Sequence, residues 1–354
     1  SRVNGMARNL LIFTGLCWSV LSILPGTILH AQRGHTVTVD SYMSIDIAHS
    51  PDGSLIAVAS KRGIDIFDAA SSKRKFQHNS DEGIYRVLQF SPDGESIVAI
   101  CDGRPPTPMR VLVEAVRWRF REDTRIEKMS AGDKSVTFRE FVFSPRYEEL
   151  FSVQNLSRGD SENYSSRIQS STGTNDTVDH VSIDDRFLRD LHFVDEGKLA
   201  IVLEAHSRLN VYDTSDWTLA YQVQLENGKA NSMDVANGRI LVLGSAEPVD
   251  KDLEQRVYWT LDLETRGKVT SRPLSDPGKY RAHFQALLTP DGASMVVQTI
   301  ELRRDRTTMS IVPVIELREV ESDTTKWRYA SEKPGDRASV SFSPDGKQLA
   351  AALD

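Results

Sequence analysis

The titratable residues of this 354-residue chain are scattered and do not form a recognisable catalytic pattern. The eight histidines include no HExxH pair and no histidine–cysteine cluster at metal-ligand spacing. The sequence contains no GxSxG elbow, P-loop or GxGxxG loop. The acidic groups Asp184–Asp185 and Asp250 with Asp252 do not begin a calcium-binding DxDxDG loop. The residues therefore predict no catalytic group, no metal site and no cofactor.

Two other patterns have a possible chemical meaning and a simpler structural one. His192 lies on a predicted strand, opposite the core side chains of that strand, where a half-buried structural histidine is the more economical interpretation. The stretch from Arg117 to Asp123 alternates basic and aromatic residues, as do surfaces that stack nucleic-acid bases. An edge strand with one packed and one charged face explains this stretch without a ligand. The net charge of −7 also argues against a nucleic-acid partner.

A four-residue turn motif recurs along most of the chain. Ser-Pro-Asp-Gly occupies residues 50–53, 91–94 and 343–346, and Thr-Pro-Asp-Gly occupies 289–292. Weaker versions begin at Ser144, Val194 and Ala236, so that successive motifs start 41 to 54 residues apart. Proline fixes φ for a type I turn and glycine accepts the left-handed conformation that follows. The residues expected to form these structural turns are Pro51, Asp52, Gly53, Pro92, Asp93, Gly94, Pro290, Asp291, Gly292, Pro344, Asp345 and Gly346.

The segments around each turn have the patterns of β-strands. Apolar residues lie three residues and one residue before most turns, the spacing that places them on one face of a strand. A continuous apolar run such as LIAVA follows each turn, as expected for a strand buried on both faces. A third strand with an acidic end follows in several repeats, ending at Asp68, Glu114, Asp213 and Asp262. Such small antiparallel sheets must stack around a ring to bury both faces.

We therefore predict an all-β chain, folded as a seven-bladed β-propeller of four-stranded antiparallel blades over residues 35–354. The strand HTVTVD, at residues 35–40, is expected to supply the outer strand of the last blade. The final repeat stops at LAAALD, directly after its second strand. The last blade is accordingly expected to be incomplete, or to be closed by the N-terminal strand, with a continuation of the chain beyond Asp354 as the favoured explanation.

The turn motif, the small-apolar strand after it and the strand with an acidic end resemble the WD-repeat-like β-propellers, in their bacterial PD-type and YVTN-type varieties. The resemblance covers about residues 36–354. No repeat carries both the Gly-His dipeptide and the Trp-Asp end of strict WD repeats. The resemblance therefore implies a fold and leaves the partner open.

Residues 1–32 are predicted to be a signal peptide or an N-terminal membrane anchor. Residues 10–29 are nearly all apolar, but the uninterrupted part ends at Leu24, short of a spanning helix. Cleavage after Ala31 fits a small residue at the cut, whereas Leu29 fits the rule poorly. We expect an extracytoplasmic protein, periplasmic or secreted, with membrane contact only through residues 10–29. Cys101 is expected to be a buried small hydrophobe.

Insertions between the second and third strands predict an interaction surface. Repeats one and four join these strands by three residues, whereas inserts begin at or near Asp102, Ser157, Ala246 and Leu302. In an up-and-down blade all these connections lie on the face opposite the Ser-Pro-Asp-Gly turns, which we call the loop face. Binding residues are commonly placed on such loops. Candidate interaction residues are Arg86, Arg139, Arg189 and Arg281, near the starts of first strands, with Arg303 and Arg304 in an insert; together they favour an anionic ligand.

These observations predict an exported, non-catalytic, monomeric scaffold that binds a protein or a cell-envelope component through the loop face. The alternative is a propeller enzyme of the lactonase-like or quinone-dependent kind, which needs acidic and histidine ligands around the central channel. A third possibility is the sensor domain of a longer enzyme.

Overall fold

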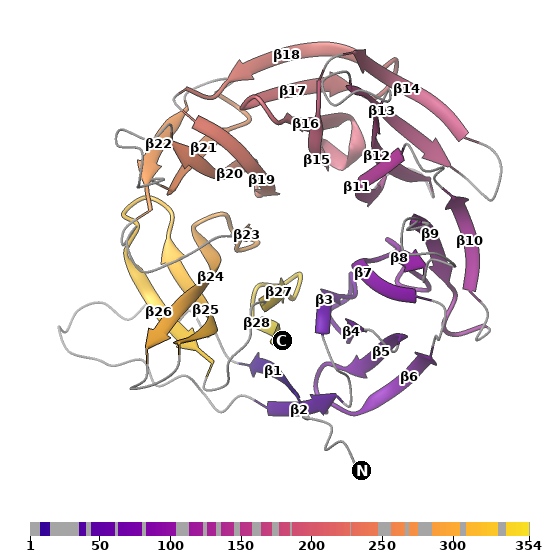
Figure 1. The fold of residues 1–354 in the computed structure, drawn as a ribbon, viewed down its shortest axis with the longest axis vertical. Helices are drawn as coiled ribbons and strands as arrows, with labels where there is room; N and C mark the ends of the chain where they lie inside the picture. The colour runs from indigo at the N-terminus through magenta and orange to yellow at the C-terminus, as the bar shows by residue number, and fades with distance from the viewer. Residues whose placement is uncertain are drawn as a thin grey trace.

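The computed structural model describes residues 8–14, 35–39, 44–60, 63–79, 83–103, 113–122, 126–131, 136–144, 149–157, 164–171, 177–184, 186–226, 228–246, 256–265, 269–274, 285–304, 309–331 and 338–353. These segments form four-stranded antiparallel sheets that follow one another around a central axis (Figure 1). The first strand of each repeat lies nearest the axis and the outermost strand lies on the rim. The chain is an all-β propeller.

Six blades are each built from four consecutive strands. The first contains β3 (Ser44–His49), β4 (Leu55–Ser60), β5 (Gly63–Asp68) and β6 (Arg74–Asn79). The second contains β7 (Gly83–Phe90), β8 (Ile97–Gly103), β9 (Val113–Trp118) and β10 (Ile126–Ala131). The third contains β11 (Val136–Phe143), β12 (Leu150–Ser157), β13 (Tyr164–Ser171) and β14 (Thr177–Asp184).

The fourth blade contains β15 (Leu188–Val194), a short 3₁₀ turn at Asp195–Gly197, β16 (Leu199–Glu204), β17 (Arg208–Asp213) and β18 (Thr218–Gln224). The fifth contains β19 (Gly228–Ala236), β20 (Arg239–Ala246), β21 (Arg256–Asp262) and β22 (Thr270–Pro273). The sixth contains β23 (Gln285–Leu288), β24 (Ser294–Arg304), β25 (Met309–Glu319) and β26 (Thr325–Ala330).

The remaining sheet corrects the predicted architecture of seven equivalent four-stranded blades. It is a small composite sheet in the order β2-β1-β28-β27, and only β27 (Ala338–Phe342) and β28 (Gln348–Leu353) come from the last repeat. The strand β1 (Arg8–Thr14) pairs with β28, and β2 (His35–Val39) pairs with β1. As predicted, residues 35–39 form the outer strand of this sheet, but its third strand is β1, so the expectation of seven equivalent blades with an incomplete last one was wrong. An apolar segment that we assigned to targeting covers the open edge of β28.

The prediction that residues 1–32 are a signal peptide or an anchor concerns the processing of the chain and stays a prediction. Within the described residues, no helix has the length and apolar character needed to cross a membrane.

The second strand of each blade is buried because both of its faces meet neighbouring sheets. Every residue of β4 is buried. Ile56 and Val58 pack in one cluster with Ala350 of the composite sheet. The intervening Ala57 packs in a different cluster, together with Leu88 of the second blade. Successive side chains of β4 thus pack against opposite neighbouring sheets, which explains the continuous apolar runs seen in the sequence.

The second blade departs from the sequence reading at its third strand. That strand was expected to end at Glu114, but β9 runs from Val113 to Trp118 and lies between β8 and β10. The stretch beginning at Arg117 is therefore partly an interior strand and not an edge strand. Arg117 is buried and donates a hydrogen bond from Nε to Oγ of Ser96 at 3.0 Å. Cys101, on β8, is buried at 5% exposure, as expected.

Hydroxyl and carboxylate groups close the repeated turns. In the first turn Ser50 Oγ donates to Asp52 Oδ1 at 2.6 Å and accepts from the backbone N–H of Leu55 at 2.9 Å. The same pattern recurs at 91–96, 289–294 and 343–348. Hydrogen bonding to the Ser50 hydroxyl is the main cause that lowers the pKa of Asp52.

The turns also touch one another around the ring. Gly53 and Gly346 have φ of 71° and 68°, a conformation that favours glycine. A β-carbon added at Gly53 would lie 3.4 Å from Cδ of Pro344, in the preceding turn of the ring. A β-carbon at Gly346 would lie 3.4 Å from Cδ of Pro290 in the same way. The proline of one turn therefore packs beside the glycine of the next.

Removing one turn hydroxyl should destabilise the fold. In Thr289→Val the shape is kept, but the buried N–H of Ser294 loses the oxygen that accepts it at 3.0 Å. We expect the free energy of unfolding to fall by about 1–3 kcal/mol, the usual cost of an unsatisfied buried donor. Urea denaturation measures the change. Thr289→Ser is the control and should stay close to the wild type; equal losses in both variants would contradict the assigned role of the hydroxyl.

Candidate functional site on the inner strands

The inner strands carry polar side chains that join neighbouring blades. Asp46 lies after a β-bulge in β3. Its Oδ2 accepts the backbone N–H of Leu88, in the second blade, at 2.6 Å. Its Oδ1 accepts the hydroxyl of Ser339, in β27, at 2.7 Å. One carboxylate therefore ties together three successive sheets.

Asp190 repeats this arrangement on the other side of the ring. It follows a bulge in β15, and its Oδ2 accepts the backbone N–H of Met233, in the fifth blade, at 2.9 Å. Asp46 and Asp190 each lie four residues before the start of their turn motif. The two aspartates therefore make equivalent links from one blade to the next.

A second set of links uses the residue two positions before the turn. Gln89 Oε1 accepts the backbone N–H of Phe143 at 3.0 Å, and Asp234 Oδ2 accepts that of Leu288 at 2.6 Å. Ser341 Oγ accepts the backbone N–H of His49 at 3.1 Å. Each bond runs from one inner strand to the next, so the polar residues of this region hold the ring together.

Asp190, His192 and Asp234 form a polar cluster between the fourth and fifth blades. The Nε2 atom of His192 lies 3.3 Å from Oδ1 of Asp190. Burial raises the pKa of Asp234, while the nearby His192 favours its charged form and Asp190 opposes it. Within the described residues, no group of three or more histidine, cysteine, aspartate or glutamate side chains is placed to hold a metal ion. His192 thus acts as a partner of Asp190.

His49 is the most strongly perturbed histidine of the described inner strands. Its Nδ1 lies 3.1 Å from Oγ of Ser341, and its Nε2 is buried without a hydrogen-bond partner. Burial lowers the pKa of the ring to about 4, against the opposing charge of Asp345. The neutral ring is therefore the stable form in the fold at neutral pH.

The predicted arginines share a backbone position in three successive blades. Arg86, Arg139 and Arg189 each lie five residues before the start of a turn motif, at a β-bulge of β7, β11 and β15. Of these three side chains, the structure describes that of Arg189. Arg281 lies outside the described residues. Arg303 and Arg304 end β24, and the structure describes only their place in the strand.

Arg189 is half-buried and has an unusual environment. Its guanidinium lies over the ring of Phe187, with Cζ 5.9 Å from the ring centroid. Its Nε is buried and has no hydrogen-bond partner. Burial is the cause that lowers the pKa of the guanidinium. The Nε–H is therefore a donor that the described residues leave unsatisfied.

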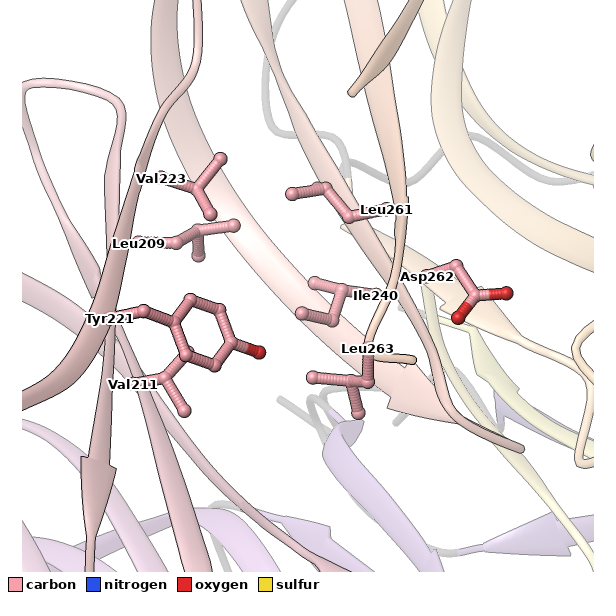
Figure 2. A pocket seen from close by; sticks show the side chains of 8 residues that line it. All are labelled: Leu209, Val211, Tyr221, Val223, Ile240, Leu261, Asp262 and Leu263. Atoms are coloured by element: carbon pink, nitrogen blue, oxygen red, sulfur yellow. The ribbon is translucent and has the colours of Figure 1, made fainter. Parts of the chain in front are cut away.

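A small recess between the fourth and fifth blades has no features of a ligand site. It offers room for about one water-sized group. Its apolar side chains belong to the core cluster that joins the two blades, as Tyr221 and Ile240 illustrate. Figure 2 shows the lining residues, which are Leu209, Val211, Tyr221, Val223, Ile240, Leu261, Asp262 and Leu263. The recess is a packing gap between two sheets.

Comparison with solved structures supports the propeller fold. Hydrazine synthase of Kuenenia stuttgartiensis is similar with a TM-score of 0.61 and 16% identity, over 94% of this chain and 99% of that chain. The β-propeller domain of Cps50 (Swd1) from Myceliophteria thermophila is similar with a TM-score of 0.56 and 10% identity, over 88% and 97% of the two chains. No protein-family model and no curated protein matches the chain. Identities this low show a shared fold and carry no function.

Loss of the Asp46 carboxylate should weaken contacts among three sheets. In Asp46→Ala the buried N–H of Leu88 and the hydroxyl of Ser339 both lose their acceptor. We expect a loss of about 2–4 kcal/mol in the free energy of unfolding, measured by urea denaturation. Asp46→Asn should recover most of it, since an amide oxygen can accept from Leu88 and the amide N–H₂ can donate to Ser339.

The control for this effect is Asp216→Ala, which removes a carboxylate bonded to Thr218 inside one exposed turn. Its cost should stay below about 1 kcal/mol, because water replaces the lost acceptor. Equal costs at both aspartates would show that the inter-blade bonds add nothing.

His49 should make stability depend on pH. Because the pKa falls from 6.5 to about 4 on folding, the unfolded chain binds the proton more readily. The contribution of the neutral ring is fully present above pH 6.5 and is lost as the pH falls towards about 4. His49→Gln should reduce this fall, as measured by urea denaturation across the window. Burial also lowers the pKa of His180, which therefore acts in the same direction. The readout is accordingly the difference between the pH profiles of the wild type and His49→Gln. Superimposable pH profiles would refute the assignment.

Proposed function

We propose that this chain is an exported, non-catalytic propeller that binds a protein or a cell-envelope component through its loop face and acts as a monomer. The ring supplies a rigid base for that face, since its inner strands are bonded from blade to blade by Asp46, Asp190 and Asp234. Export rests on the apolar N-terminal segment of the sequence, and because residues 10–14 of it pair with β28, we propose that the exported protein keeps this segment uncleaved. The similarity to other propellers supports the scaffold and leaves the partner to be found.

The observation that carries the proposal is the long hairpin of the sixth blade. The strands β4 and β24 both begin five residues after the start of their turn motif. However, β4 has 6 residues and β24 has 11, paired with β25 through Arg304 and Met309. At about 3.3 Å per residue, the hairpin extends roughly 16 Å further along the strand direction than that of the first blade. We call residues 300–304 and 309–313 the arm.

The arm has the features expected of a contact element. The arm is packed in part, since Val312 is 2% exposed and Glu301 Oε2 accepts a hydrogen bond from Nη2 of Arg328, in β26, at 2.7 Å. Ile311, on the arm, is 38% exposed. Binding surfaces are commonly built on such projecting segments of a rigid scaffold.

Two other exposed apolar residues mark a competing surface. Val178 and Leu219 are 55% and 51% exposed, and both lie near the starts of outer strands, β14 and β18. In an up-and-down blade, these starts lie on the face of the Ser-Pro-Asp-Gly turns. Scattered exposed apolar residues are normal, so the loop face is favoured by its arm.

Site-specific photo-crosslinking separates the two surfaces. A benzoylphenylalanine at Ile311 should crosslink a partner in the source organism's extract, and the same group at Leu219, on the opposite face, should not. Mass spectrometry of the crosslinked product identifies the partner and the contact. Thermal unfolding of both variants checks that the fold is kept. Crosslinks from Leu219 and none from Ile311 would reverse the assignment of the face.

A further inference from the structure

Arg189 differs from the two buried arginines among the described residues. Arg318 pairs with Glu316 and Asp323 at 2.5 and 3.0 Å, and Arg117 donates from Nε to Oγ of Ser96 at 3.0 Å. For Arg189 the described residues provide only the ring of Phe187. A partly buried cation without an acceptor destabilises the fold, because it loses hydration and gains no partner.

The carboxylate next to Arg189 in β15 and the one opposite Leu188 in β16 are already engaged. Asp190 Oδ1 accepts the backbone N–H of Leu191 at 2.9 Å and lies near His192, while Oδ2 accepts the N–H of Met233. Glu204 is bonded to Arg186 and Asn210. An acceptor for Arg189 therefore has to come from outside these groups.

The position of Arg189 is repeated in the two preceding blades. Arg86, Arg139 and Arg189 lie at a bulge of β7, β11 and β15, which are the inner strands of three successive blades (Figure 1). Each residue lies in the half of its strand that is nearer the loop face, since the strand runs from there towards its turn motif. The backbone thus places three arginine positions on neighbouring inner strands, each in the half nearer the loop face.

We propose that the mouth of the ring on the loop face binds an acidic peptide segment of a partner protein, with Arg189 donating to one of its carboxylates. Successive arginines on neighbouring strands suit successive carboxylates of an extended chain, and guanidinium groups bind carboxylates with directed hydrogen bonds. The net charge of −7 disfavours a long polyanion such as a nucleic acid. This inference rests on the proposed function, because it names the partner chemistry of the same loop face.

Fluorescence anisotropy with a fluorescein-labelled hexaglutamate peptide tests the site on the full chain. We expect the wild type to bind at about 0.1 M salt and to bind less at about 1 M salt. Arg189→Gln should weaken binding by at least about tenfold. Lys347→Gln removes the same charge on the opposite face, from a side chain that is 72% exposed, and should leave binding within about twofold. Equal weakening in both variants, or no binding by the wild type, would overturn the proposal.

Stability gives an independent readout. If Arg189 is kept for binding, Arg189→Gln should unfold at a higher urea concentration than the wild type, because an unpaired buried charge is removed. A structural arginine would instead destabilise the protein when replaced. Inorganic phosphate is the competing probe: displacement of hexaglutamate by phosphate at equal concentration would indicate a small-anion site and overturn the peptide assignment.

The two proposals fail separately. Binding of hexaglutamate that depends on Arg189, without crosslinks from Ile311, would support the acidic-peptide site and reject the arm. Crosslinks from Ile311 together with unchanged binding by Arg189→Gln would do the reverse.

Discussion

The structure depends on a packing constraint: a four-stranded sheet with two apolar faces cannot bury both of them alone. In β4 successive side chains serve different neighbours, since Ile56 packs towards the composite sheet and Ala57 towards the second blade. Closure into a ring lets every sheet bury both of its apolar faces in this way. The buried strands, the small residues within them and the circular order of the blades all follow from this constraint.

Hydrophobic contact sets the order of the blades but leaves the backbone of the inner strands with unpaired donors. The carboxylates of Asp46, Asp190 and Asp234 accept these N–H groups from the next blade. Burial raises the pKa of Asp46 and Asp234, so the links are made in a region where charge is costly. Acidic and histidine groups near the axis therefore have a structural use, and Arg189 stands out because, among the described residues, its guanidinium contacts only the ring of Phe187.

The repeated turns and the buried second strands were predictable, because both depend on residues that are close in the sequence. The pairing of β1 with β28 was not, since it joins Leu10 to Ala352 across nearly the whole chain. An apolar run near the N-terminus has the same composition in a targeting segment and in a buried strand. The links by Asp46 and Gln89 were missed as well, although a polar residue four or two positions before a turn was a usable signal. The arginine positions were visible in the sequence, but the lack of an acceptor for Arg189 among the described residues needed side-chain geometry.

The contact between neighbouring turns bears on how the number of repeats can increase in evolution. At three junctions one repeat supplies a proline and the next a glycine, as Pro344 with Gly53, Pro51 with Gly94 and Pro290 with Gly346 show. A gene duplication that copies one whole repeat preserves both halves of this contact, whereas a break inside the motif separates them. Enlargement by complete units is therefore the route that this architecture tolerates best.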